Sequence, residues 1–177
     1  MVIINDTPFP DELNNFGYPF QLDHFQKYAL NSINKKNNTL ITAHTGSGKT
    51  LPAEYAIQKM IFEGKRVIYT SPIKSLSNQK YYDFKNKYPE ISFGLITGDI
   101  KCNPCAQCLI MTTEILRNAL FEHRMKETAH NMFEMNFETE LGCIIYDEVH
   151  YINDTERGRV WEEAMMLNPT ETLLVML

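Results

Sequence analysis

The sequence predicts an α/β protein with a parallel sheet that carries helices on both faces, in three layers. Short apolar runs rich in β-branched residues alternate with segments of helical period, and several runs are apolar almost throughout, as strands buried on both faces are. The chain has no internal repeat and no low-complexity stretch, which favours one compact unit. We expect residues 1–19 to be an N-terminal extension and residues 20–177 to form the folded lobe.

The alternation gives each element an approximate place. The expected strands cover residues 39–43, 66–71, 91–97, 107–112, 141–146 and 172–177. The expected helices cover residues 23–33, 48–62, 74–87, 113–121 and 158–167. The charged, Met- and Phe-rich segment 122–140 fits either an inserted helix or a long loop.

Composition and charge narrow the classes of protein. The 177 residues are 44% hydrophobic and 22% charged, which is ordinary for one globular domain. No run of about 18 apolar residues and no signal-peptide pattern is present, so we expect an intracellular protein without a membrane partner. The net charge of −5 means that any contact with nucleic acid has to be local.

The last residues, 172–177, read as a core strand. A core strand is normally followed by further structure. We therefore expect the chain to be a piece of a longer protein.

A phosphate-binding loop is predicted between the first strand and the second helix. Its sequence is Ala43-His44-Thr45-Gly46-Ser47-Gly48-Lys49-Thr50, with alanine in place of the usual first glycine. The glycines let backbone N–H groups turn toward a phosphate, and the helix N-terminus adds its positive dipole end. Lys49 is expected to reach the β and γ phosphates, and the Thr50 hydroxyl is expected to bind Mg²⁺. By itself the pattern could also be a glycine-rich turn with a chance lysine.

A second acidic motif follows the apolar strand at 141–146. Asp147-Glu148-Val149-His150 places two adjacent carboxylates at the carboxyl edge of the sheet, where ligands bind in such folds. Asp147 is expected to hold Mg²⁺, and Glu148 is expected to orient and deprotonate the attacking water. An acidic pair after a strand is usually a solvated turn, but the upstream phosphate loop favours catalysis.

The sequence resembles the superkiller-type DExH RNA helicases of superfamily two, the class that feeds RNA to the exosome. The resemblance covers about residues 20–169. Beyond the two motifs above, it is carried by Phe20-Gln21-Leu22-Asp23-His24-Phe25-Gln26, by Tyr69-Thr70-Ser71-Pro72-Ile73-Lys74-Ser75-Leu76-Ser77-Asn78-Gln79-Lys80, by Thr97-Gly98-Asp99, by Met111-Thr112-Thr113-Glu114-Ile115-Leu116-Arg117 and by the residues after His150. The string Ser71-Pro72-Ile73-Lys74 and the segment after His150 are distinctive of this branch.

The resemblance implies a fold, cofactors and partners. The fold would be a RecA-like P-loop NTPase lobe, the cofactors ATP and Mg²⁺, and the partners single-stranded RNA, a second RecA-like lobe and an RNA-decay complex. Gln26 would bond the adenine edge and Phe20 would pack on the base, although both could simply belong to the edge of the first helix. His150 would couple the site to a neighbouring segment. Without arginines from a second lobe, we expect this chain to bind ATP and barely hydrolyse it.

The residues that contact the nucleic acid are expected at strand ends. Such positions offer backbone N–H groups and hydroxyls to a strand phosphate. The expected contacts are Ser71, Pro72, Lys74, Thr112, Thr113 and Glu114. The resemblance adds Gly98 and Asp99, although a Thr-Gly-Asp turn is by default just a turn.

Three alternatives remain from the sequence. A DNA-directed motor of superfamily two would share the phosphate loop and the acidic pair. A fragment that binds ATP or nucleic acid without turnover would also fit. Finally, Cys102, Cys105 and Cys108 form a C-x₂-C-x₂-C pattern that invites a metal, although no fourth ligand stands at the spacing of a known motif.

Overall fold

A computed structural model of the chain describes residues 9, 16–44, 46–125 and 135–177. Its helices are α1 (His24–Asn34), α2 (Thr50–Phe62), α3 (Lys74–Lys87), α4 (Thr113–Arg124) and α5 (Gly158–Met166), with a 3₁₀ helix η2 (Val149–Asn153). Its strands are β1 (Thr39–Leu40), β2 (Arg66–Ser71), β3 (Phe93–Ile96), β4 (Lys101–Cys102), β5 (Cys108–Thr112), β6 (Leu141–Tyr146) and β7 (Leu173–Met176).

The strands form one sheet in the order β1-β7-β6-β2-β5-β3-β4. Every neighbouring pair is parallel except β3 and β4, which pair antiparallel at the edge. The central strands β2 and β5 are buried along nearly their whole length, because helices cover both faces. The predicted α/β class and the parallel sheet are confirmed.

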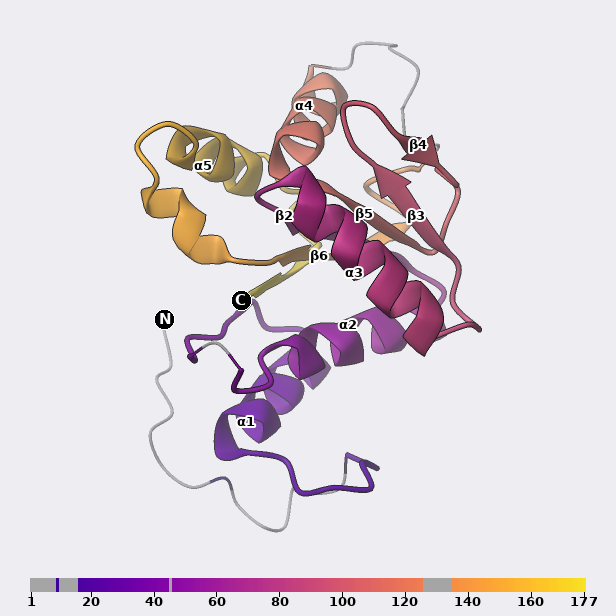
Figure 1. Ribbon diagram of the computed structural model, residues 1–177, viewed down its shortest axis with the longest axis vertical. Coiled ribbons are helices and arrows are strands. Elements are labelled where there is room, and N and C mark those ends of the chain that lie inside the picture. The colour runs from indigo at the N-terminus through magenta and orange to yellow at the C-terminus, as the bar shows by residue number, and fades with distance from the viewer. Residues whose placement is uncertain (1–8, 10–15, 45, 126–134) are drawn as a thin grey trace.

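Helices cover the two faces of the sheet in separate groups (Figure 1). Side chains of α1, α2 and α3 share one apolar cluster with Val67, Tyr69 and Ile145. Side chains of α4 and α5, including Trp161, share a second cluster with Ile68 and Ile144. Successive residues of a strand point to opposite faces, so neighbours on β2 and β6 fall in different clusters. The result is the predicted three-layer arrangement.

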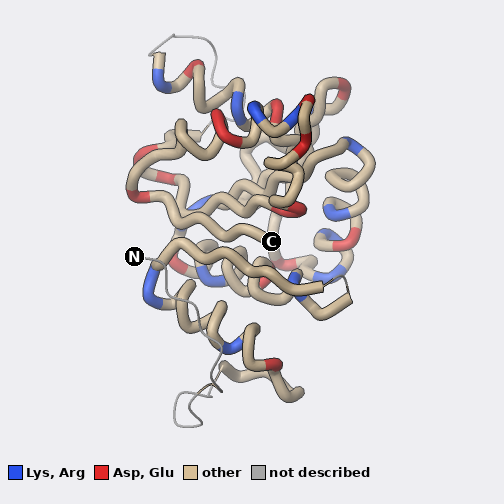
Figure 2. Tube along the Cα trace, turned by 90° about the vertical axis from the view of Figure 1, so that its left-hand side faces the viewer, with Lys and Arg blue, Asp and Glu red and all other residues tan. Residues whose placement is uncertain are grey.

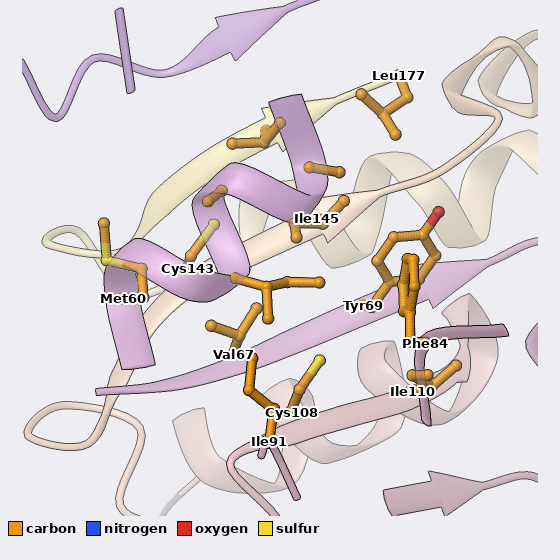
Figure 3. Close-up of a cluster of buried hydrophobic side chains, with 14 of the residues drawn as sticks. Met60, Val67, Tyr69, Phe84, Ile91, Cys108, Ile110, Cys143, Ile145 and Leu177 are labelled. Carbon is orange, nitrogen blue, oxygen red and sulfur yellow. The ribbon is translucent and has the colours of Figure 1, made fainter. Parts of the chain in front are cut away.

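The first cluster is packed around sulfur-containing and aromatic side chains (Figure 3). Tyr69 on β2 meets Phe84 on α3 edge to face, with ring centroids 5.3 Å apart. The thiols of Cys108 on β5 and Cys143 on β6 are fully buried there. Burial raises the pKa of both thiols well above the ordinary range of cysteine. Both thiols therefore behave as small apolar side chains.

Local chemistry explains where α1 and α2 begin and end. Asp23 and Gln26 form a reciprocal capping box at the start of α1. Pro52 is accommodated in the first turn of α2, where its missing N–H costs nothing. Gly64 ends α2 in the left-handed region at a φ of 74° and donates to the carbonyl of Ile61.

Three features differ from the predicted elements. The strand expected at 39–43 is only Thr39–Leu40, because the chain leaves the sheet to begin the phosphate loop after Ile41 bonds Met176. The antiparallel strand β4 was not predicted, since two residues carry no periodicity. Of the segment 122–140, α4 continues to Arg124, while residues 126–134 lie outside the described residues.

Phe9, which belongs to the expected N-terminal extension, packs against the lobe. Phe9 is buried, and its ring meets Tyr28 of α1 edge to face at 5.0 Å. Its N–H donates to Nδ1 of His24. The described helices include none long and apolar enough to cross a membrane.

Candidate nucleotide and nucleic-acid site

Five motif loops leave the sheet at the same edge. Strands β1, β7, β6, β2, β5 and β3 all run parallel, so their carboxyl ends point the same way. The phosphate loop follows β1, Pro72 follows β2, Thr97 to Asp99 follow β3, Thr113 follows β5 and Asp147 follows β6. Ligands of open α/β sheets bind at this edge. The fold thus brings together motifs that are dispersed along the sequence.

The phosphate loop has the backbone that its glycines predict. Gly46 and Gly48 both lie in the left-handed region, at φ values of 84° and 82°, where other residues are strained. Thr50 opens α2, with Lys49 as its N-cap. Ser47 Oγ is buried and has no hydrogen-bond partner among the described residues. A phosphate oxygen would satisfy that hydroxyl, so these residues fit a triphosphate with Mg²⁺. His44 is exposed, and Thr45 lies outside the described residues.

Gln26 lies against the phosphate loop. Its Oε1 accepts from the backbone N–H of Asp23 at 2.9 Å, and its Nε2 donates to the Gly48 carbonyl at 3.2 Å. A Cβ added at Gly48 would lie 2.7 Å from that Nε2. The side chain predicted to read the adenine edge is therefore adjacent to the loop, and both ends of its amide already have partners.

Phe20 lies in the segment that precedes α1, and it is exposed. Its side chain is 54% exposed, and its ring centroid lies 5.4 Å from that of Tyr18. The two rings line a shallow pocket together with Gly17, Leu22 and Lys27. The exposed ring of Phe20 offers a face on which a planar base can stack.

Asp147 is the most tightly held group of the site. Tyr69 donates its hydroxyl to Asp147 Oδ2 at 2.6 Å, and the N–H of Glu148 donates to Oδ1 at 3.0 Å. Lys80 Nζ lies 3.8 Å from the same Oδ2. The carboxylate is buried, and its three partners come from β2, α3 and the backbone of the next residue. Burial, followed by the charge of Asp147 and their hydrogen bond, raises the pKa of Tyr69 well above its ordinary value, so Tyr69 is a hydroxyl donor at neutral pH.

Glu148 has an unusual backbone. Its φ of 57° and ψ of 47° lie in the left-handed region, which non-glycine residues enter at a cost. The following residue, Val149, donates its N–H to the carbonyl of Leu177. The conformation turns the chain from β6 into η2, with the Glu148 side chain half-buried. His150 Nδ1 lies 3.3 Å from Glu148 Oε2, and the His150 side chain is exposed.

Four expected nucleic-acid contacts have buried side chains. Thr70 donates its hydroxyl to Thr113 Oγ1 at 3.1 Å, and the hydroxyls of Ser71 and Ser77 are 2.7 Å apart. Ser71, Thr112 and Thr113 are all buried. This differs from the expectation that their hydroxyls face a strand phosphate. The Ser71 hydroxyl joins the end of β2 to α3, and the Thr113 hydroxyl joins the start of α4 to the end of β2. Pro72 is also buried, and its carbonyl accepts from Arg157 Nη1 at 3.4 Å.

Of the expected contacts, Lys74, Gly98 and Asp99 are exposed and Glu114 is half-buried. Lys74 Nζ and Asp99 Oδ2 form an exposed ion pair at 2.6 Å. A Cβ at Gly98 would lie 3.4 Å from the same Nζ. A cation and an anion therefore stand side by side where a nucleic-acid backbone was predicted to pass.

Tyr69 and Lys80 were not among the site residues predicted from the sequence. Tyr69 falls in an apolar strand, so its pattern indicates a core residue. Lys80 lies in a polar helix, where lysine is usually solvated. Only their position in the same string of residues as Ser71 and Lys74 could have drawn attention to them.

The structure places the four cysteines differently. Cys102 and Cys105 are exposed, whereas Cys108 and Cys143 are buried. Within the described ranges, no group of three His, Cys, Asp or Glu side chains is close enough to hold a metal ion. His130, one candidate fourth ligand, lies outside those ranges, and His123 pairs with Glu138.

Charge is mixed over the surface. Figure 2 shows Lys and Arg interspersed with Asp and Glu along the chain. Helix α3 carries both signs, and its Lys87 pairs with Glu54 on α2. A mixed surface agrees with the expectation that nucleic acid is held by local contacts.

Residues 23–177 match the DEAD/DEAH box helicase family. The antiviral helicase SKI2 of Saccharomyces cerevisiae is 45% identical over 160 residues, which are 90% of this chain and 12% of that protein. The exosome RNA helicase MTR4 of Homo sapiens is 46% identical over 160 residues, 90% of this chain and 14% of that protein. The chain spans between 12% and 15% of the length of such curated relatives.

Two solved structures share the fold. The DUF1998 helicase MrfA, bound to DNA and AMPPNP, superposes with a TM-score of 0.67 at 19% identity, covering 96% of this chain and 27% of that one. A variant of Dbp5 from S. cerevisiae, bound to RNA and ADP BeF3, gives a TM-score of 0.63 at 20% identity, covering 86% and 39%. The predicted RecA-like architecture is confirmed by these neighbours.

Proposed function

Because the chain belongs to the DEAD/DEAH box helicase family, we propose that it is the ATP-binding first motor lobe of an ATP-dependent RNA helicase. The observation that carries the proposal is one sheet edge that holds both the phosphate loop and the Asp147-Glu148 pair. In this reading the lobe couples ATP hydrolysis to movement on RNA or to its unwinding, together with a second RecA-like lobe.

The phosphate loop would bind the nucleotide. The N–H groups around Gly46 and Gly48 and the N-terminus of α2 would receive the phosphates, and Lys49 would neutralise their charge. The buried Ser47 hydroxyl would gain the partner that it lacks among the described residues. Phe20 would stack on the base, and Gln26 would exchange one of its present bonds for the adenine edge.

The acidic pair would divide the remaining chemistry. Thr50 and Asp147 would hold Mg²⁺, which supplies charge neutralisation for the phosphates when it is bound. Glu148 would orient a water toward the γ-phosphate and accept its proton. Tyr69 and the Glu148 N–H keep the Asp147 carboxylate in one orientation for this role. His150, beside Glu148, would connect the site to a neighbouring segment.

RNA would pass along the accessible part of the same edge. Lys74, Gly98, Asp99 and Glu114 are the side chains or turns open to solvent there, and the buried Ser71, Pro72, Thr112 and Thr113 would contribute backbone groups. RNA is preferred over DNA because relatives such as MTR4 are named as RNA helicases. An RNA-decay complex is the corresponding partner, proposed from the exosome in the name of the same relative.

Slow turnover by this lobe alone is part of the proposal. Arginines from a second lobe that complete the γ-phosphate site can contribute about 10³ to 10⁵ in rate. We therefore expect this chain to bind ATP with Mg²⁺ and to hydrolyse it poorly.

The test measures binding and hydrolysis on one preparation. Binding of a fluorescent ATP analogue is followed with Mg²⁺, and ATP hydrolysis is followed with and without single-stranded RNA. Lys49→Ala is expected to abolish binding, whereas Glu148→Gln is expected to preserve binding and remove residual hydrolysis. No binding by the unaltered chain would refute the proposal. Fast hydrolysis that RNA stimulates and Glu148→Gln abolishes would refute the part that requires a second lobe.

RNA and DNA strands of the same sequence separate the two substrate classes. Contacts to the 2′-hydroxyl distinguish RNA from DNA at a given site. Tighter binding of the RNA strand is expected. Equal or tighter binding of the DNA strand would favour a DNA-directed motor instead.

A further inference from the structure

The side chain of Lys80 is more buried than its polar helix would predict. It lies on α3, its side chain is only 21% exposed, and its Nζ is 3.8 Å from Asp147 Oδ2. The same Nζ lies about 6 Å from the ring centroids of Tyr69 and Phe84, at 6.0 and 5.9 Å. A lysine can bury its stem in this way while its ammonium reaches a charged partner.

The other two partners of Asp147 are fixed, and Lys80 is movable. The Tyr69 hydroxyl is carried by a fully buried ring on β2, and the Glu148 N–H belongs to the backbone. Lys80 reaches the carboxylate through a flexible four-carbon stem. Of the described cationic side chains, Lys80 is the one that pairs with Asp147.

We propose that Lys80 is a positioning residue: it neutralises Asp147 in the metal-free lobe and withdraws from it when Mg²⁺ arrives with nucleotide. The inference rests on the proposed function, because it takes Asp147 as a metal-binding group. Two cations beside one carboxylate repel each other, so the ammonium and the metal ion compete for Asp147. The bonds from Tyr69 and the Glu148 N–H persist and keep the carboxylate oriented. Lys80 would thereby set the Mg²⁺ concentration at which nucleotide binds.

The test is a Mg²⁺ titration of fluorescent ATP-analogue binding, with no need for turnover. Lys80→Met keeps an apolar stem against the two rings and removes the charge. It is expected to lower the Mg²⁺ midpoint at least about threefold, because the competing cation is gone. Lys80→Arg keeps the charge and is expected to stay near the unaltered midpoint. A midpoint that Lys80→Met leaves unchanged or raises would overturn the inference.

A matched control separates this effect from a general change of surface charge. Lys85 lies on the same helix, and its Nζ bonds Tyr81 Oη at 3.3 Å, away from Asp147. Lys85→Met is expected to leave the midpoint unchanged. An equal shift in Lys85→Met and Lys80→Met would also overturn the inference.

A double-mutant cycle on stability keeps the inference testable even if nucleotide does not bind. The free energy of unfolding is measured for the unaltered chain, Lys80→Met, Asp147→Asn and the double variant, in the absence of metal and nucleotide. A favourable coupling between the two sites supports the pairing, and a coupling of zero overturns it. Failure of nucleotide binding would refute the proposed function, whereas a zero coupling would refute the role of Lys80 alone.

Discussion

The hydroxyl of Tyr69 donates to Oδ2 of Asp147 at 2.6 Å, across two neighbouring strands of the sheet. The tyrosine is fully buried (Figure 3), so no water can replace it without repacking. Tyr69→Phe should therefore lower the free energy of unfolding by about 1 to 3 kcal/mol, the cost of removing one partner of a buried charged group. Urea unfolding monitored by circular dichroism measures the loss.

Tyr82→Phe is the matched control for this prediction. Tyr82 is 62% exposed on α3, and its variant should change the free energy of unfolding by less than about 0.5 kcal/mol. Equal effects of the two variants would show that the hydroxyl bond to Asp147 contributes nothing.

The ion pair of Lys74 and Asp99 should matter for binding and little for stability. The two side chains are 53% and 73% exposed, so their attraction is screened by water. Lys74→Ala should change the free energy of unfolding by less than about 1 kcal/mol. It should also weaken single-stranded RNA binding and reduce the slope of log affinity against log salt by about 0.7, the value for one phosphate contact. Fluorescence anisotropy at several salt concentrations measures both quantities.

Lys87→Ala provides the comparison for Lys74→Ala. Lys87 is 56% exposed at the other end of α3 and also pairs with a carboxylate, that of Glu54. Its variant should bind RNA as the unaltered chain does. A similar loss in both variants would mean that Lys74 acts only through general charge.

The left-handed backbone of Glu148 should cost stability that glycine would recover. The free energy of unfolding of Glu148→Gly should exceed that of Glu148→Ala by about 1 kcal/mol, because alanine keeps the strain and glycine has none. Urea unfolding of both variants measures the difference. Both variants lose the carboxylate, so their difference isolates the backbone. Coincident unfolding curves would argue against strain at this residue.

Stability should fall as the pH rises above about 8.5. Burial raises the pKa of the Cys108 thiol, and burial together with the nearby Cys108 raises that of Cys143. The folded state keeps both protons while the unfolded chain releases them, so the unfolded state is favoured as pH rises. Each thiol should contribute a slope of up to about 1.4 kcal/mol per pH unit. Urea unfolding between pH 8 and 10 with a reductant present measures the slope.

Variants of single cysteines assign this pH dependence. Cys143→Ala should flatten the slope, whereas Cys102→Ala, at an exposed position, should not. The comparison of slopes is independent of any constant loss of stability from the cavity that Cys143→Ala leaves. An unchanged slope in Cys143→Ala would place the titrating groups elsewhere.

The sequence was informative where one pattern repeats or one motif is rigid. The buried strand β6 is apolar throughout, and β2 is apolar from Val67 to Tyr69, so their place and their parallel pairing could be predicted. The glycines of the phosphate loop adopt the left-handed backbone that the motif requires. In such segments the residue type follows from a single physical requirement, which is burial on both faces or a left-handed backbone.

Prediction was poorer where the role of a residue depends on its neighbours in space. Ser71 and Thr113 looked like accessible hydroxyls, yet they bond inside the protein, because α3 and α4 cover them. Lys80 looked solvated, yet its side chain is largely buried and its Nζ lies near the rings of Tyr69 and Phe84, 3.8 Å from Asp147 Oδ2. Neither outcome can be derived from spacing along the chain, because the partners are brought by other strands and helices.

The two bonds of the Gln26 amide have a consequence for the dynamics of the lobe. One bond closes the first turn of α1 and the other ends on Gly48, 22 residues away. If adenine draws the amide away from either bond, as proposed above, the N–H of Asp23 or the carbonyl of Gly48 has to bond water instead. Hydrogen exchange at the amide of Asp23 would then report on the occupancy of a loop to which Asp23 does not itself bond. The loss of hydrogen bonding at the start of α1 would then offset part of the binding free energy of the base.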